Sequence, residues 1–482
     1  MKRLLYLVIL INALNASANP RIDAHQKALD ALSKLTFTKD GRGMVLAPDF
    51  VKTYEMMAKF LGLSHTDRPK INENPLKALA PFKSRWGLID HDNEIKGFFN
   101  VPYKNMQIGA MGCIVCHSGK VAGNYYIGLG NKNVDIGQMA TDAKLAQEMW
   151  HNMTVLMPRS AEKKELEKDS FAFFSRLADK RYNNLTQGLV PISMIQVWFY
   201  ENVGGRPLPL NNARGQVKVP SFWGYGKKKS IGQFSDGFGD GNFAGWGLAV
   251  EFAGTQTAQN ILSMIPEITH AEELLGDILP PKYPFAIKSE LVPHGEKIFV
   301  ETCASCHGTY QKDSAGLSVF KEPEHIPIEE INTDRNRLVS VNQEFFDLVD
   351  RNPMGQVVRR TGLTPGYFAP RLEAIWARFA YLHNASVPTI SALLTEPSKR
   401  PVVWSLIDAG ERSRFDEINL GYTLPAAGSA EEKDLLEKAK SGHRNVYYTK
   451  RVGQSAIGHW FKSFEKLTAQ DKKDLIEYLK TL

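Results

Sequence analysis

Two stretches of the same form decide the fold, Cys113-Ile114-Val115-Cys116-His117 and Cys303-Ala304-Ser305-Cys306-His307. The chain has four cysteines in 482 residues, and these two motifs use all of them. Cys-x-x-Cys-His is the attachment pattern of a c-type haem. The two thiols can form thioethers with the two vinyl groups of one porphyrin, and the histidine then lies under the ring and binds iron. The sequence therefore predicts two covalently bound haem c groups, at Cys113, Cys116 and His117 and at Cys303, Cys306 and His307.

Cysteine pairs of this kind have other uses, namely a zinc site or a redox-active dithiol. A dithiol does not need the histidine that follows each pair. Chance is a poor explanation for two matches that use every cysteine of a chain with a secretion signal. Haem attachment is therefore the favoured interpretation.

The N-terminus has the layout of a secretory signal peptide. Lys2 and Arg3 precede an apolar run from Leu4 to Leu14, and Ala16-Ser17-Ala18 offers small residues for cleavage. The apolar run is shorter than the ~20 residues that a membrane-spanning helix needs. We therefore expect a signal peptide over residues 1–18 and a periplasmic or secreted protein with no membrane span after its removal.

The composition is that of a soluble globular protein, with 43% hydrophobic and 23% charged residues. The net charge of +7 is spread along the chain without a long Lys/Arg block. This distribution argues against nucleic-acid binding. A mildly basic surface suits an acidic redox partner protein, for example a small cytochrome or a cupredoxin.

A proline-rich stretch, Pro280-Pro281 and Pro284, marks a linker. We predict an N-terminal haem domain over residues 19–285 and a C-terminal cytochrome c domain over residues 286–482. The expected fold class is mainly α with extensive irregular structure. Helices are predicted over residues 47–63 and 137–184, and irregular backbone over residues 70–130 and 204–254.

The second domain has recognisable edges. A short helix around Gly295 and Phe299 leads into the second cysteine pair. Thr468 and Asp471 form a capping box before a last helix with an apolar stripe. In cytochrome c domains the first and last helices cross beside the haem, with a glycine and an aromatic residue at the contact. The domain thus resembles a cytochrome c domain with a large insertion, residues 308–458.

The sixth ligand of each iron is the main functional question, because it decides between electron transfer and ligand chemistry. His459 is favoured at the second haem, since it precedes the terminal helix; the other candidates are His325, Met354, His383 and His443. No sixth ligand stands out at the first haem. Aromatic residues there, Phe222, Trp223, Phe234, Phe238 and Trp246, either form core or wall a pocket above an open iron. If they are core, the iron would be capped by a side chain such as Met106, Met139 or His151.

Several segments resemble a known family in the same order along the chain. They are Arg85–Leu88, Gly112–Gly119, Pro220–Trp223, Asp240–Asn242, Ile375–Thr389, Gly458-His459 and Leu475–Lys480. The family is the group of di-haem proteins that includes the bacterial rubber oxygenases. It is related to di-haem cytochrome c peroxidases and to the di-haem enzyme of methylamine utilisation.

The resemblance implies a division of labour between the haems. The N-terminal haem would meet oxygen or peroxide, and the C-terminal haem, held by His307 and His459, would pass electrons. It also implies that Phe222, Trp223 and Phe238 line the oxygen-binding face and that His383 acts near the haems. Ala385 and Ala380 stand where the family usually shows Gly and Pro, which bears on the substrate more than on the haem chemistry.

Two functions therefore stand side by side. One is a secreted di-haem oxidoreductase, peroxidase-like or rubber-oxygenase-like; the other is a non-catalytic periplasmic electron-transfer cytochrome. Related peroxidases often hold a calcium ion between domains, but no acidic loop in this sequence supports one.

Overall fold

The computed structural model of the protein describes residues 20–33, 75–103, 106–154, 186–191, 193–209, 215–225, 262–312, 325–356 and 366–482, with a few shorter pieces between them. The predicted signal peptide and the aromatic residues Phe234, Phe238 and Trp246 lie outside the described residues. So do most of residues 47–63 and of residues 155–184, which belong to the segments predicted as helices over residues 47–63 and 137–184.

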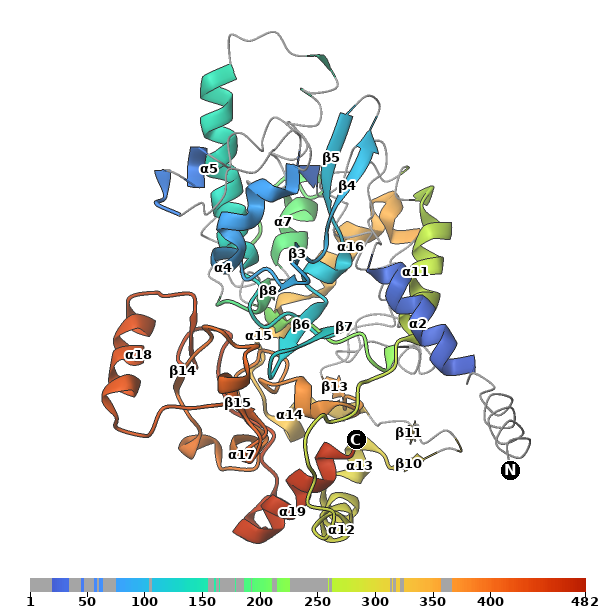
Figure 1. Cartoon of the computed structure of the whole chain (residues 1–482), viewed down its shortest axis with the longest axis vertical. Coiled ribbons are helices and arrows are strands. Elements are labelled where there is room, and N and C mark those ends of the chain that lie inside the picture. The colour runs from blue at the N-terminus through green and yellow to red at the C-terminus, as the bar shows by residue number, and fades with distance from the viewer. Residues whose placement is uncertain are drawn as a thin grey trace, which may run out of the picture.

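Helices and short strand pairs build the N-terminal part, in the upper half of Figure 1. The helices are α2 (Pro20–Leu32), η1 (Pro75–Phe82), α4 (Lys83–Trp86), α5 (Ile136–Thr154), α7 (Ser193–Asn202) and α11 (Ile265–Asp277). The strands pair antiparallel as β1 (Val45–Leu46) with β5 (Met106–Met111), β4 (Phe98–Tyr103) with β5, β2 (Asp90–His91) with β3 (Glu94–Ile95), β6 (Ser118–Val121) with β7 (Asn124–Ile127), and β8 (Leu189–Pro191) with β9 (Gln216–Lys218).

Residues 70–130 contain more regular structure than we expected. Two of the hairpins turn through pairs of residues with positive φ: Asp92 and Asn93 at 55° and 60°, and Ala122 and Gly123 at 51° and 84°. Two-residue loops with positive φ at both positions match the twist of the flanking strands. The strands of these two hairpins are only two to four residues long, too short for a clear alternation in the sequence. Strands β4 and β5 in the same segment have six residues each and were also not predicted.

The first and last helices of the C-terminal part cross, in the lower half of Figure 1. They are α12 (Val292–Thr302), which leads to α13 (Ala304–His307), and α19 (Ala469–Lys480). A Cβ atom on Gly295 would lie 2.0 Å from the Asp474 carbonyl oxygen, so only glycine allows this approach. The Phe299 and Tyr478 rings meet at the same contact, with centroids 5.2 Å apart. The predicted capping box of Thr468 and Asp471 is also present.

The insertion between these helices consists of short elements. Its helices are α14 (Ile328–Ile331), α15 (Asn336–Ser340), α16 (Gln343–Asp350), η4 (Pro353–Gln356), η5 (Ile375–Ala377), α17 (Ile390–Leu393), η6 (Pro397–Lys399), η7 (Arg412–Arg414), α18 (Ala430–Lys440) and, just after it, η8 (Lys462–Lys466). Its strand pairs are β10 (Tyr310–Lys312) with β11 (Ser318–Phe320), β12 (His325–Pro327) with β13 (Gly366–Phe368), β14 (Val403–Ser405) with β17 (Val446–Tyr448), and β15 (Phe415–Asp416) with β16 (Gly421–Tyr422).

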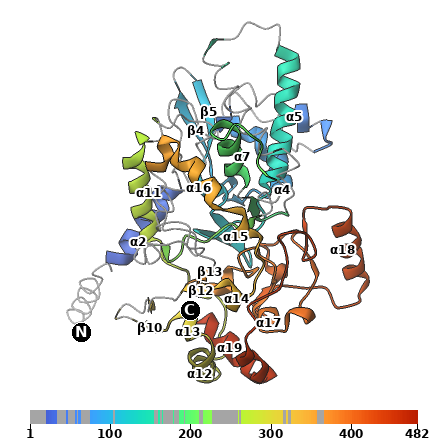
Figure 2. The ribbon, with the colours of Figure 1, turned by 180° about the vertical axis from the view of Figure 1, so that it is seen from behind.

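The hydrophobic core runs across the predicted domain boundary at residue 285. Helix α16 of the insertion packs on α7, where Phe345 and Phe199 meet edge to face with centroids 5.7 Å apart. Figure 2, seen from behind, places these two helices next to each other in the upper half. The insertion is therefore packed into the N-terminal part as well as the C-terminal part.

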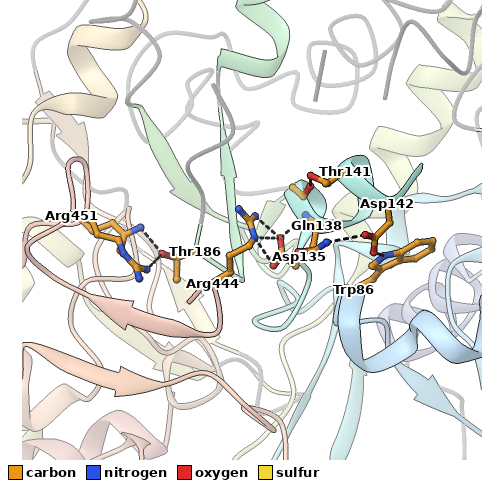
Figure 3. A network of polar contacts seen from close by, with 10 residues as sticks. Trp86, Asp135, Gln138, Thr141, Asp142, Thr186, Arg444 and Arg451 are labelled. Carbon is orange, nitrogen blue, oxygen red and sulfur yellow. Dashed lines mark hydrogen bonds and ion pairs between the residues drawn. The ribbon is translucent and has the colours of Figure 1, made fainter. Parts of the chain in front are cut away.

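A polar network also joins the two parts (Figure 3). Arg444 Nε donates to Asp135 Oδ2 at 2.8 Å, and Arg451 Nη1 donates to Thr186 Oγ1 at 2.9 Å. Asp135 follows the first haem motif closely, whereas both arginines belong to the insertion. The first motif and the segment that leads to His459 are thus held in one framework.

In the described part of the chain, no helix has both the length and the apolar character that crossing a membrane would require.

Candidate functional site

Both cysteine motifs fold as one helical turn. The His117 amide donates to the Cys113 carbonyl at 2.9 Å, and the His307 amide donates to the Cys303 carbonyl at 2.9 Å. Residues three apart on such a turn lie on the same side. The two thiols of each motif therefore face the same way, as attachment to one porphyrin requires.

Each motif histidine is oriented by a proline carbonyl. His117 Nδ1 lies 2.9 Å from the Pro220 oxygen, and His307 Nδ1 lies 3.0 Å from the Pro370 oxygen. Because a carbonyl only accepts, we assign the proton to Nδ1 in both rings, which leaves the lone pair of Nε2 for a metal. Burial lowers the pKa of His117 to about 4 and also lowers the pKa of His307. Both imidazoles are neutral at neutral pH, which is the form that binds iron.

At the second site, a second imidazole, that of His459, lies near His307. The rings of His307 and His459 have centroids 6.3 Å apart and planes inclined by 49°. Two metal–nitrogen bonds of about 2 Å, with about 1 Å from each nitrogen to its ring centre, require about 6 Å. The residues present therefore fit a haem iron held from both sides. Burial lowers the pKa of His459 to about 3, so its ring is neutral as well.

The other candidate ligands of the second haem lie elsewhere. His443 is exposed, and His325 packs against Phe368 with ring centroids 5.0 Å apart. The side chain of Met354 lies outside the described residues. Among the described imidazoles, the ring that contacts His307 is that of His459.

His383 is partly buried between two segments of the chain. Its ring stacks on Tyr367 with centroids 5.4 Å apart, and its carbonyl accepts from the Lys218 amide at 2.8 Å. Within the described structure, Nε2 of His383 has no hydrogen-bond partner. Burial lowers its pKa to about 4, so the ring is neutral.

The first site has a phenyl ring against its ligand. Phe222 stacks on His117 with centroids 3.9 Å apart and planes inclined by 15°. Gly128 brings the two together, since its amide donates to the His117 carbonyl and its carbonyl accepts from the Phe222 amide. We expected Phe222 on the oxygen-binding face, whereas this contact places it beside the ligand imidazole itself.

The other residues expected near the first haem are placed in part. Trp223 Nε1 donates to the Ile127 carbonyl at 3.1 Å, which sets the indole against β7. Met139 is buried on α5, and His151 on the same helix is exposed. Phe238 and the side chain of Met106 lie outside the described residues.

One of the four thiols, that of Cys303, is poorly suited to a zinc or redox site. Burial raises the pKa of Cys303 to about 11, whereas reactive and metal-binding cysteines need a lowered pKa. Within the described residues, no group of three or more His, Cys, Asp or Glu side chains could hold a metal ion. The calcium ion that related peroxidases often hold therefore gains no support from this part of the chain.

The sequence analysis missed three residues that shape the sites, namely Pro220, Pro370 and Arg400. Pro220 lies 103 residues after His117, whereas Pro370 lies 63 residues after His307. No common spacing links the prolines to the motifs. Arg400 makes only backbone contacts, which carry no pairing signal in the sequence.

Comparison with known proteins agrees with this picture. The chain is 28% identical over 239 residues to uncharacterized protein y4iM of Sinorhizobium fredii, covering 42% of this chain and 52% of that protein. It is 26% identical over 273 residues to uncharacterized protein y4iJ of the same organism, covering 44% and 43%. The chain thus spans about half the length of the curated relatives it matches.

A family model described as RoxA-like, cytochrome c-like, matches residues 366–405. The matched stretch contains Pro370, His383 and Arg400. Through this stretch the chain is similar to the rubber-oxygenase-like c-type cytochromes, and the match implies that it binds haem c.

Proposed function

We propose that this protein is a secreted di-haem c-type cytochrome oxidoreductase. Its N-terminal haem binds oxygen or peroxide, and its C-terminal haem transfers electrons. The observation that carries the proposal is a difference between the two sites. His459 lies near His307, with ring centroids 6.3 Å apart, whereas Phe222 stacks on His117 at the first site.

The second site is suited to electron transfer. If His307 and His459 held one iron from both sides, no place would remain for an external ligand, and the group would supply electron transfer without binding substrate. The Pro370 carbonyl fixes the tautomer of His307, and the protein framework around His459 fixes the second ring. A small cytochrome or a cupredoxin is the expected electron partner.

The two sites share their proximal chemistry. Both motif histidines donate to a neutral carbonyl, which raises the basicity of the imidazole less than a carboxylate would. The two sites differ instead in the ring beside each motif histidine, since His459 lies near His307 and Phe222 stacks on His117. When bound, the first haem would supply an iron able to accept oxygen or peroxide.

The residues of the chain around the first haem would restrict access and water. Phe222 covers one face of the His117 ring, and Trp223 packs edge-on against Tyr126 with centroids 6.2 Å apart. Apolar walls favour a neutral diatomic ligand and an apolar substrate over a charged one. His383, neutral and with Nε2 unbonded in the described structure, is proposed to hold or move a proton there.

Ligand binding tests the proposal. We expect the reduced protein to bind one carbon monoxide per chain, at the first haem, while the second haem keeps its low-spin spectrum. Cyanide should bind the oxidised first haem in the same ratio. If neither form binds any external ligand, both irons are saturated and the protein is an electron carrier.

Turnover then separates the two enzyme activities. Peroxide consumption with a reduced cytochrome as donor would indicate a peroxidase. Oxygen consumption with short polyisoprene oligomers would indicate cleavage of an apolar substrate. If the first haem binds ligands but neither assay shows activity, the proposed substrates are wrong, whereas the proposal of an open first haem stands.

A further inference from the structure

Arg400 is a buried cation whose guanidinium is surrounded by backbone carbonyls. It follows η6 directly and is only 4% exposed. Its Nε atom lies 3.2 Å from the Ala392 oxygen and 3.0 Å from the Thr395 oxygen, and Nη2 lies 3.2 Å from the Leu393 oxygen. These bonds anchor one side of the guanidinium to the end of α17.

The other side of the guanidinium reaches the turn that carries His459. Nη1 donates to the Ala456 carbonyl at 2.6 Å and to the Gly458 carbonyl at 2.9 Å, and Nη2 lies 3.4 Å from the His459 carbonyl. Arg400 therefore joins two segments that are far apart in the sequence. Burial lowers its pKa to about 10, so it is still a cation at neutral pH.

The backbone of this turn adopts a conformation that needs support. His459 has φ 48°, in the left-handed region that non-glycine residues rarely occupy. Gly458 precedes it at φ 84°, and a Cβ there would lie 2.4 Å from the Thr333 nitrogen. The His459 amide donates to the Ile331 carbonyl at 2.7 Å. The carbonyls on the other side of the turn are the ones that Arg400 holds.

The ring of His459 is held differently from the ring of His307. His307 is oriented through Nδ1 by the Pro370 carbonyl, whereas Nδ1 of His459 is buried without a hydrogen-bond partner there. Phe461 and Phe464 flank the ring, with centroids 5.2 and 5.8 Å away. The direction of the ring toward His307 is thus set by its backbone and by apolar packing.

We propose that Arg400 is the positioning residue of the sixth haem ligand: its guanidinium holds the Ala456–His459 turn so that His459 faces His307. The inference rests on the proposed function, because it takes His459 as a ligand of the C-terminal haem. Without the guanidinium, the strained turn would relax, and the imidazole would leave the position opposite His307.

The test compares four variants of the full-length haem protein by electron paramagnetic resonance, carbon monoxide binding and thermal melting. Arg400→Ala removes the clamp, and Arg400→Lys keeps the charge but cannot span both segments. His459→Ala is the reference for complete loss of the ligand. Arg451→Ala is the matched control, because Arg451 also donates to backbone carbonyls, those of Val446, Ala439 and His443, but does not touch the turn.

We expect Arg400→Ala to lose much of the low-spin signal of the second haem and to bind carbon monoxide there when reduced. Arg400→Lys should lose an intermediate share of the low-spin signal. If Arg400→Ala does not fold, the spectrum of Arg400→Lys alone tests whether Arg400 positions His459. Arg451→Ala should melt at a lower temperature with an unchanged spectrum.

Three results would overturn the inference, and each points to a different error. A full low-spin signal in both Arg400 variants, with loss in His459→Ala, would show that Arg400 does not position the ligand while the proposed ligation stands. An equal loss in Arg451→Ala would reduce the effect to general destabilisation. An unchanged signal in His459→Ala would instead contradict the proposed ligation itself.

Discussion

The two haem motifs of this chain have the same local structure and different surroundings. Each is one helical turn, and each motif histidine is bonded to a proline carbonyl at 2.9 or 3.0 Å. Beyond that the sites diverge, since a second imidazole faces His307 and a phenyl ring stacks on His117. The comparison teaches that a Cys-x-x-Cys-His motif specifies haem attachment and one axial ligand only. The rest of each coordination sphere comes from distant parts of the chain.

The sites also differ in what holds their second half. At the second site, the Arg400 contacts and the bond from the His459 amide to the Ile331 carbonyl hold the His459 turn. At the first haem, Gly128 links the β6–β7 hairpin to Phe222 through two backbone hydrogen bonds. The arrangement around His459 supports a fixed second ligand, whereas the arrangement around Phe222 supports a packed aromatic residue beside His117.

The largest effect is expected from removing the thiols. Replacing Cys113 and Cys116 by serine should remove one haem and leave the other, and replacing Cys303 and Cys306 should do the converse, because thioethers survive denaturation. Mass spectrometry of the denatured chains measures this directly, with the two-haem wild type as reference. A wild-type chain that carries one haem or none would contradict the prediction that both motifs bind haem.

The next effect concerns the facing imidazole. His459→Ala should convert the second haem from low-spin to high-spin with both haems still attached, because an axial ligand is lost. Electron paramagnetic resonance and optical spectra report the change. His443→Ala, at an exposed histidine, is the matched control and should leave the spectra unaltered. If His459→Ala keeps the low-spin signal, Met354 or another histidine is the ligand.

A smaller effect is expected from the ring on His117. Phe222→Leu should alter carbon monoxide affinity and the spectrum of the first haem, because the stacked ring orients the ligand imidazole, at a cost of roughly 1–2 kcal/mol in stability. Phe199→Leu, also fully buried, should cost a similar free energy without a spectral change. Identical ligand affinities in wild type and Phe222→Leu would reduce Phe222 to ordinary packing.

The smallest effect is expected at the junction between the two parts. Asp135→Asn removes the charge that faces Arg444, which should lower the free energy of unfolding by about 1–3 kcal/mol and leave both haem spectra unchanged. Urea unfolding measures the loss. Lys438→Ala, which breaks an exposed pair with Asp434, is the control and should cost about 0.5 kcal/mol or less. Equal costs would mean that the junction contributes no more than a surface contact.

Local signals in the sequence were sufficient for several elements. The capping box of Thr468 and Asp471 predicted the start of α19, and Gly295 predicted the close crossing with that helix. The turns at Asp92-Asn93 and Ala122-Gly123 also have residues typical of tight hairpins, and attention to them would have predicted β2, β3, β6 and β7. These features depend on residues close together in the chain.

The position of Phe222 could not be predicted in the same way. Its neighbour His117 is distant in sequence, and the contact depends on hydrogen bonds of Gly128 to both residues. The stacking also differs from the face that the family resemblance implied. Similarity of segments named Phe222 as a residue near the first motif, and the stacking on His117 is a contact that it did not specify.

By itself the sequence predicted the haem attachment points, the motif histidines as ligands and the helices that begin and end the C-terminal part. Each follows from spacing along a few residues, where covalent geometry and hydrogen bonding within one turn leave few alternatives. Only the tertiary structure decided that His459 stands 6.3 Å from His307, that Phe222 lies on His117 and that Arg400 holds the turn between α17 and the terminal helix. Those contacts join residues far apart in the chain, and their geometry depends on how all the intervening segments pack.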